Sequence, residues 1–132
     1  MILAFIGIAS FYGAQANAAD VLSSLQWKKR LLVVSALRPD NLALMRQRQI
    51  FTDAHKAMTE RDVVLVEAVG STDAAQEIRQ KLSIAPREFL ALLVGKDGHI
   101  VLSSQTELSA SYLSQVIDAM PMRQDEMRLN NR

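Results

Sequence analysis

The stretch Phe89-Leu-Ala-Leu-Leu-Val-Gly-Lys-Asp-Gly-His-Ile-Val-Leu-Ser103 decides the fold of this chain. It holds an unbroken apolar run, an Asp97-Gly98 pair and a second, shorter apolar run. Asp-Gly between two apolar runs is a strong signal for a tight turn, because glycine adopts positive φ angles at little steric cost. The stretch therefore predicts a buried β hairpin, around which the other elements can be placed.

Two further strands are expected before the hairpin. Residues 31–37 form a continuous apolar run rich in β-branched side chains, which predicts a central strand covered on both faces. Residues 63–69 predict a second strand with Glu67 as its one charge. Period-two alternation turns Glu67 toward solvent on an edge strand, and the alternative is a general base with a perturbed pKa.

Three amphipathic helices are expected between and after these strands, over residues 42–60, 72–82 and 109–120. Asp40 or Asn41 is expected to cap the first, and Pro121 to stop the last. Residues 20–27 predict a helical lead-in in which Trp27 covers an edge of the core. The run Lys28-Lys29-Arg30 predicts a solvated entry to the first strand rather than an anion site.

The predicted element order is β-α-β-α-β-β-α, which is the plan of a thioredoxin-like three-layer α/β sandwich. A right-handed crossover pairs the first two strands in parallel, and the hairpin extends the sheet beside the first strand. The result is a central mixed sheet of four strands. The alternative is another small α/β sandwich with a mixed sheet, since element order alone rarely determines topology.

The N-terminal residues 1–19 carry no charged side chain and resemble a signal peptide. Small residues suit cleavage after Ala18 or Ala19, so we expect export and a periplasmic or secreted protein. The alternative is an uncleaved anchor, although Gly13, Gln15 and Asn17 interrupt the apolar run before the roughly 20 residues that a span needs. Residues 20–128 are expected to form the domain, and 129–132 a frayed tail.

The amino-acid composition excludes several kinds of partner and several kinds of chemistry. The chain of 132 residues has 15 basic and 14 acidic residues and a net charge of +1, so no nucleic-acid partner is expected, and no membrane partner after cleavage. Cysteine is absent, which excludes thiol redox chemistry, disulfides and thiolate metal sites. His55 and His99 are the only histidines and lack metal-ligand spacing, so no metal or other cofactor is expected.

Four segments of the chain resemble a known family: residues 26–32, 60–64, 92–98 (Leu-Leu-Val-Gly-Lys-Asp-Gly) and 117–123 (Ile-Asp-Ala-Met-Pro-Met-Arg). They are similar to the thioredoxin-like domain of unknown function 4174 family of bacterial envelope proteins, related in fold to domains of sushi-repeat-containing matrix proteins, with this chain as a cysteine-free member. The resemblance implies a thioredoxin- or peroxiredoxin-like fold and an exported location, and it adds no catalytic residue.

The candidate site is the rim, defined as the loop after the first strand together with the loop before the hairpin. Thiol-active relatives of this fold carry their cysteine in the first of these loops, and thioredoxins place a cis-proline directly before the hairpin strand. Arg38, Asp40, Pro86 and Arg87 are the candidate binding residues here. The alternative is that Asp40 caps a helix and both arginines are simply solvated. Ser35 lacks the glycine-flanked elbow of a serine nucleophile.

These features favour a protein- or peptide-binding module of the cell envelope, without thiol redox activity and not an enzyme. The expected partner is a protein or peptide that contacts the rim or an exposed sheet edge. The alternative is a thiol-independent enzyme of unknown type that acts on oxidants in a peroxiredoxin-like fold. A third possibility is an accessory subunit that residues 1–19 anchor in the membrane.

Overall fold

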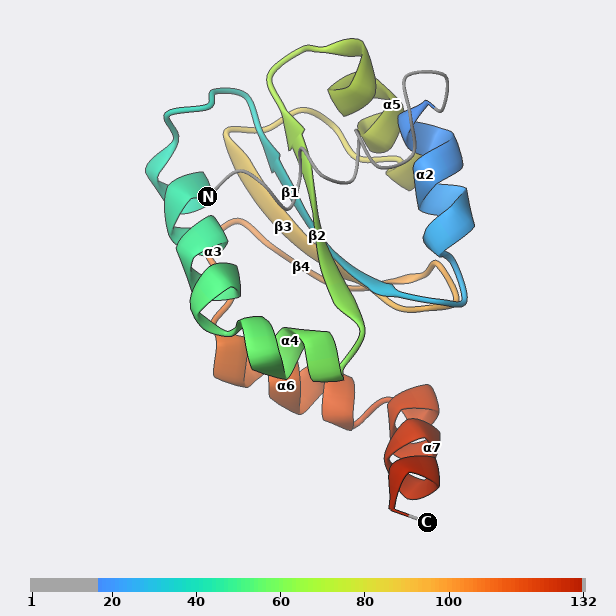
Figure 1. The fold of residues 1–132 in the computed structure, drawn as a ribbon. Helices are drawn as coiled ribbons and strands as arrows, with labels where there is room; N and C mark the ends of the chain where they lie inside the picture. The colour runs from blue at the N-terminus through green and yellow to red at the C-terminus, as the bar shows by residue number, and fades with distance from the viewer. Residues whose placement is uncertain (1–16, 132) are drawn as a thin grey trace.

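The computed structural model describes residues 17–131. Most of the segment expected to be a signal peptide, residues 1–16, lies outside them. The elements, labelled as in Figure 1, are α2 (Ala18–Leu25), β1 (Arg30–Ala36), α3 (Leu42–Asp53), α4 (His55–Glu60), β2 (Val63–Val69), α5 (Asp73–Leu82), β3 (Phe89–Val94), β4 (Ile100–Ser104), α6 (Ala110–Asp118) and α7 (Pro121–Asn130).

The four strands form one mixed sheet in the order β2-β1-β3-β4. β1 pairs in parallel with β2 and antiparallel with β3, and β3 pairs antiparallel with β4. This confirms the predicted hairpin, its turn at Gly98, whose φ is 89°, and its place beside the first strand. It also confirms β1 as a central strand, since all seven of its residues are buried.

Two helical layers cover the two faces of the sheet (Figure 1). Helices α3, α4 and α6 lie on one face and α2 and α5 on the other. Alternate residues of β1 point into the two cores, with Leu32 and Val34 on the first face and Leu31 and Val33 on the second. The chain therefore has the mixed α/β architecture predicted from the sequence, in an order consistent with a thioredoxin-like fold.

The helix expected over residues 42–60 is divided at Ala54 into α3 and α4, which run in different directions (Figure 1). A straight helix of that length would extend about 28 Å, whereas a strand of seven residues spans about 23 Å. The change of direction keeps both Leu44 and Met58 buried in the core. Asn41 caps α3, since its Oδ1 accepts a hydrogen bond from the Leu44 amide at 2.9 Å.

Two other local predictions are wrong. Trp27 does not cover the core: its side chain is exposed and its φ is 72°, because the chain turns sharply between α2 and β1. Arg30 is not solvated: it is 1% exposed, and its guanidinium forms a salt bridge with Glu126 at 3.0 Å. A cation at the start of a central strand stays buried here because an acidic side chain from α7 neutralises it.

Helix α7 is held mainly by such ion pairs rather than by an apolar face. Pro121 ends the predicted last helix and is also the first residue of α7. Glu126 contacts both Arg30 and Lys96, and Arg123 contacts Asp118 at 3.1 Å. Arg123 is the one buried residue of α7. None of the helices in the described part of the chain is long and apolar enough to cross a membrane.

Candidate functional site

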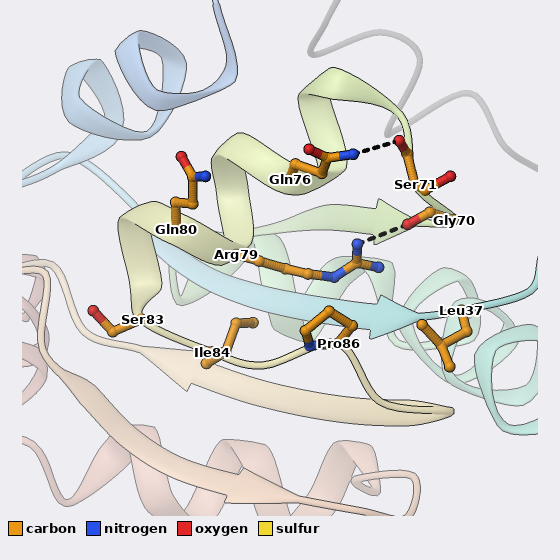
Figure 2. Close-up of a pocket in the computed structure, with 9 residues that line it drawn as sticks. All are labelled: Leu37, Gly70, Ser71, Gln76, Arg79, Gln80, Ser83, Ile84 and Pro86. Carbon is orange, nitrogen blue, oxygen red and sulfur yellow. Dashed lines mark hydrogen bonds between the residues drawn. The ribbon is translucent and has the colours of Figure 1, made fainter.

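A cavity of about 670 Å³, called the main cavity below, lies beside α5, where the parallel strands β1 and β2 end (Figure 2). Its wall has a polar side from the turn after β2 and from α5, and an apolar side from the two rim loops. The lining residues are Leu37, Gly70, Ser71, Gln76, Arg79, Gln80, Ser83, Ile84 and Pro86. This volume lies within the roughly 300–1,000 Å³ of small-molecule pockets.

Arg79 is the one charged residue in this lining, and helix α5 positions it. Thr72 begins the helix, because its hydroxyl accepts the Ala75 amide hydrogen bond at 3.1 Å. Ala75, Ile78 and Arg79 are the buried residues of α5, so the arginine lies on the apolar stripe that packs on the sheet. Its side chain reaches from α5 to the ends of the two strands (Figure 2).

Arg79 is 5% exposed, and its guanidinium donates four hydrogen bonds. Nε donates to the Ser35 hydroxyl at 3.0 Å, and Nη1 donates to the Gly70 carbonyl at 2.7 Å. Nη2 donates to the carbonyls of Ala36 at 3.1 Å and Ala68 at 2.9 Å. The side chain therefore ties the ends of β1 and β2 together with neutral acceptors alone.

The charge of Arg79 distinguishes it from the other buried cations. Arg30, Lys96 and Arg123 each have a carboxylate within 4.0 Å. Arg79 has none among the described residues. Burial lowers the pKa of its guanidinium, which nevertheless stays protonated in any protein environment. The cavity thus has a positive charge at its wall that carbonyl dipoles offset only in part, an arrangement that suits an anionic ligand.

The predicted residues Arg38 and Asp40 lie beside this cavity and pair with each other. Two hydrogen bonds of 3.0 Å join the Arg38 guanidinium to the Asp40 carboxylate, and both side chains are exposed. These bonds lower the pKa of Asp40. Together with Leu37, Asn41 and Glu88 the pair lines a second hollow of about 330 Å³. Because Leu37 lines both hollows, the two are adjacent.

The two rim loops meet, as expected, through a hydrogen bond of 3.3 Å from the Asn41 side chain to the Glu88 carbonyl. Pro86 lines the main cavity. The described peptide bonds are all trans, so Pro86 does not reproduce the cis-proline of thioredoxins. Arg87 does not share a hollow with Arg38 but lines a third one of about 450 Å³ with residues of β4, which adjoins the main cavity through Ser83 and Ile84. The binding roles of all four residues stay predictions.

Sequence reasoning missed Ser35 and Arg79 as site residues and misplaced Glu67. Ser35 is fully buried, and its hydroxyl accepts a hydrogen bond from Arg79. The signal for Arg79 was its spacing of four residues from Ala75 on the buried stripe of α5. Glu67 does lie on an edge strand but is 2% exposed, because Arg48 from α3 covers it with two hydrogen bonds of 2.6 and 2.8 Å.

Other chemistry is sparse in residues 17–131. They contain no group of three or more histidine, aspartate or glutamate side chains that would hold a metal ion. His99 is 86% exposed and contacts Asp97 at 3.2 Å in the hairpin turn. The buried carboxylate of Glu67 is paired with the guanidinium of Arg48 at 2.6 Å. The Arg79 cavity is distinguished by a buried charge that lies at the wall of an accessible hollow and has no carboxylate of the described residues within 4.0 Å.

Comparisons with known proteins identify the family of the chain but no activity. Coiled-coil domain-containing protein 80 of Danio rerio is 26% identical over 137 aligned residues, which cover 83% of this chain and 16% of that protein. The chain therefore spans less than a fifth of the length of this curated relative. No solved structure matches the chain. A family model matches residues 21–126, and the chain belongs to this family, described as domain of unknown function (DUF4174).

Proposed function

We propose that this domain is a binding module that holds a peptide segment of a protein partner in the cavity beside α5, without thiol chemistry. The observation that carries the proposal is the cavity itself, about 670 Å³ in volume and bounded by both rim loops. Leu37, Ile84 and Pro86 supply an apolar wall, and the backbone of Gly70 and Ser71 lies opposite (Figure 2). Pockets that combine apolar walls with a few polar groups are typical ligand sites.

A peptide selection tests this proposal directly, because it does not require an identified partner. Random peptides displayed on phage are selected on the immobilised protein, and the bound pool is measured on two variants. Ser71→Trp places a large side chain on the cavity lining, whereas Ser111→Trp adds the same side chain at an exposed position of α6, on the other face of the sheet. Both serines are exposed, so neither change disturbs the core.

The expected result is that Ser71→Trp reduces binding of the pool by about tenfold or more, while Ser111→Trp leaves binding unchanged. A pool that binds both variants equally would place the peptide elsewhere and contradict the proposal. Arg38→Ala and Arg87→Ala add a second readout. If the rim contributes as the sequence predicts, each variant weakens binding by a few-fold, because exposed charges contribute modestly.

We also propose that the chain acts in the cell envelope, as a periplasmic or secreted protein. The support is the uncharged segment 1–19 and a family match that begins only at residue 21. The intact mass of the protein purified from its native envelope tests this. A mass that corresponds to a chain beginning at Ala19 or Asp20 supports export with cleavage. A mass that corresponds to a chain still containing residues 1–19 favours the anchored alternative.

A further inference from the structure

We propose that the cavity beside α5 binds a carboxylate group, and that Arg79 is the residue that recognises its negative charge. This inference rests on the proposed function, and it names the chemical group by which the bound segment is anchored. The relevant geometry is a guanidinium that is nine-tenths buried and lies at the wall of an open cavity (Figure 2).

The donor inventory of Arg79 leaves room for a ligand. A guanidinium carries five N–H groups in a fixed plane. Four are used, one on Nε, one on Nη1 and two on Nη2. The remaining N–H belongs to Nη1, the nitrogen that also contacts the Gly70 carbonyl at the cavity wall. Because Nη1 lies at the wall of the cavity, this N–H is available to donate a charge-assisted hydrogen bond to an oxygen of a bound ligand.

The charge inventory points to an anion rather than a neutral ligand. No carboxylate of the described residues lies within 4.0 Å of Arg79, although each of the other buried cations has one. The rest of the cavity lining is uncharged, with Gln76, Gln80, Ser71 and Ser83 as its polar side chains. A buried cation is stabilised most by a charge-assisted hydrogen bond to an anionic acceptor.

A carboxylate fits the site better than a phosphate group does. One spare N–H and one positive charge match a monoanion, whereas phosphate sites in proteins gather several backbone amides or cations. The opposite wall of Leu37, Ile84 and Pro86 is apolar and suits an aliphatic group next to the carboxylate. The carboxylate has two natural sources in a peptide, the C-terminal group and an acidic side chain.

Three small probes separate these possibilities by NMR titration of the folded protein at constant ionic strength. N-acetyl-leucine carries a terminal carboxylate, N-acetyl-leucinamide is its neutral analogue, and N-acetyl-glutamate α-amide carries only a side-chain carboxylate. The backbone amide signals of Gly70, Ser71 and Ser83 report binding in the cavity. We expect saturable shifts with at least one of the two acids, and binding about tenfold or more tighter than that of N-acetyl-leucinamide.

Two variants and a control make the test specific. Arg79→Met removes the charge and should abolish the preference for the acid. Arg79 is buried, so that variant risks unfolding and a second variant is needed. Gln80→Glu places a carboxylate on the cavity lining at an exposed position. Gln80→Glu should lower the affinity for the acid relative to that for the amide by about tenfold. Gln115→Glu makes the same charge change at an exposed position of α6 and should alter neither.

Each contrary outcome is informative. If the acids and the amide bind equally, or if Gln80→Glu and Gln115→Glu behave alike, the carboxylate assignment is overturned while peptide binding in the cavity stands. If no probe produces a saturable shift at these amides, the assignment is also overturned, and the peptide selection decides the proposed function by itself. The acid that binds more tightly identifies the C-terminus or a side chain as the source.

Discussion

Replacing Glu126 with glutamine removes the charge that neutralises two buried cations at the base of α7. The Glu126 carboxylate accepts hydrogen bonds from Arg30 at 3.0 and 3.1 Å and from Lys96 at 2.8 Å. Lys96 keeps Asp62 as a partner at 2.8 Å, but Arg30 keeps only the Arg61 carbonyl. The substitution is nearly isosteric, so the loss reports on charge rather than on packing.

The expected destabilisation is about 2–3 kcal/mol at pH 7. Removing one partner of a buried ion pair costs about 3–5 kcal/mol. The Arg30 side chain is 1% exposed, but that of Glu126 is 23% exposed, so water reaches part of the vacated site and reduces the cost. Urea unfolding followed by circular dichroism measures this effect, which corresponds to a shift in midpoint of about 1–2 M.

The pH dependence of the free energy of unfolding shows whether the charge of Glu126 causes the destabilisation. Burial alone would raise the pKa of Glu126, but the hydrogen bonds from Arg30 and Lys96 outweigh burial and lower the pKa below the ordinary 4.5. A carboxylate with a lowered pKa in the folded state contributes stability above its unfolded pKa and loses it as the pH falls. The wild type and Glu126→Gln should therefore converge in stability as the pH drops below about 4.5.

Glu107→Gln is the matched control. Its partner Arg46 lies 4.0 Å away and is 64% exposed, so the expected change is within about 0.5 kcal/mol. The reasoning is refuted if Glu126→Gln is no more destabilising than this control at pH 7. It is also refuted if the difference between Glu126→Gln and the wild type stays constant down to pH 3.

Two further substitutions test the fold. Gln47→Leu should lower the free energy of unfolding, measured in urea, by about 2–4 kcal/mol. The buried Gln47 amide forms hydrogen bonds with both the N–H and the carbonyl of Leu108, and each group left unpaired costs about 1–3 kcal/mol. A loss of less than about 1 kcal/mol would mean that water replaces the amide. Gly98→Ala should lower the free energy of unfolding by about 1–2 kcal/mol. A φ of 89° is strained for any L residue with a side chain, and the new Cβ would lie 3.0 Å from the side-chain amide nitrogen of Gln26. Unchanged stability would show that the hairpin turn relaxes.

The apolar elements were predictable because their patterns are local. The unbroken run of β1 needs cover on both faces, and α3 and α5 supply it. Asp97 and Gly98 determine the hairpin turn through backbone geometry alone. The helical lead-in follows from the same kind of pattern, and its residues Leu22 and Leu25 are buried as the pattern predicts.

The buried charges were not predictable, because their partners are distant in the chain. Arg30 meets Glu126 across 96 positions and Glu67 meets Arg48 across 19. A pattern of apolar and polar residues assigns a lone charge to solvent, which is right for most surface residues. The same rule placed Arg30 and Glu67 outside the core. Only the packing of α3 and α7 supplies the opposite charges that make burial tolerable.

The position of the rim loops was predictable, but the residues that line the rest of the cavity were not. The rim loops do border the cavity, through Leu37 and Pro86. Arg79 was missed because a cation in an amphipathic helix usually faces water, although its spacing from Ala75 places it on the buried stripe of α5. Its acceptors are mostly backbone carbonyls at the ends of β1 and β2, and a sequence does not reveal which strand ends converge on one side chain.

The most direct test of the carboxylate site is a structure of the protein with N-acetyl-leucine bound. We expect a carboxylate oxygen at about 2.7–2.9 Å from Nη1 of Arg79, with the leucine side chain against Leu37, Ile84 and Pro86. A ligand bound outside this cavity, or bound within it with the carboxylate turned to solvent, would contradict the account.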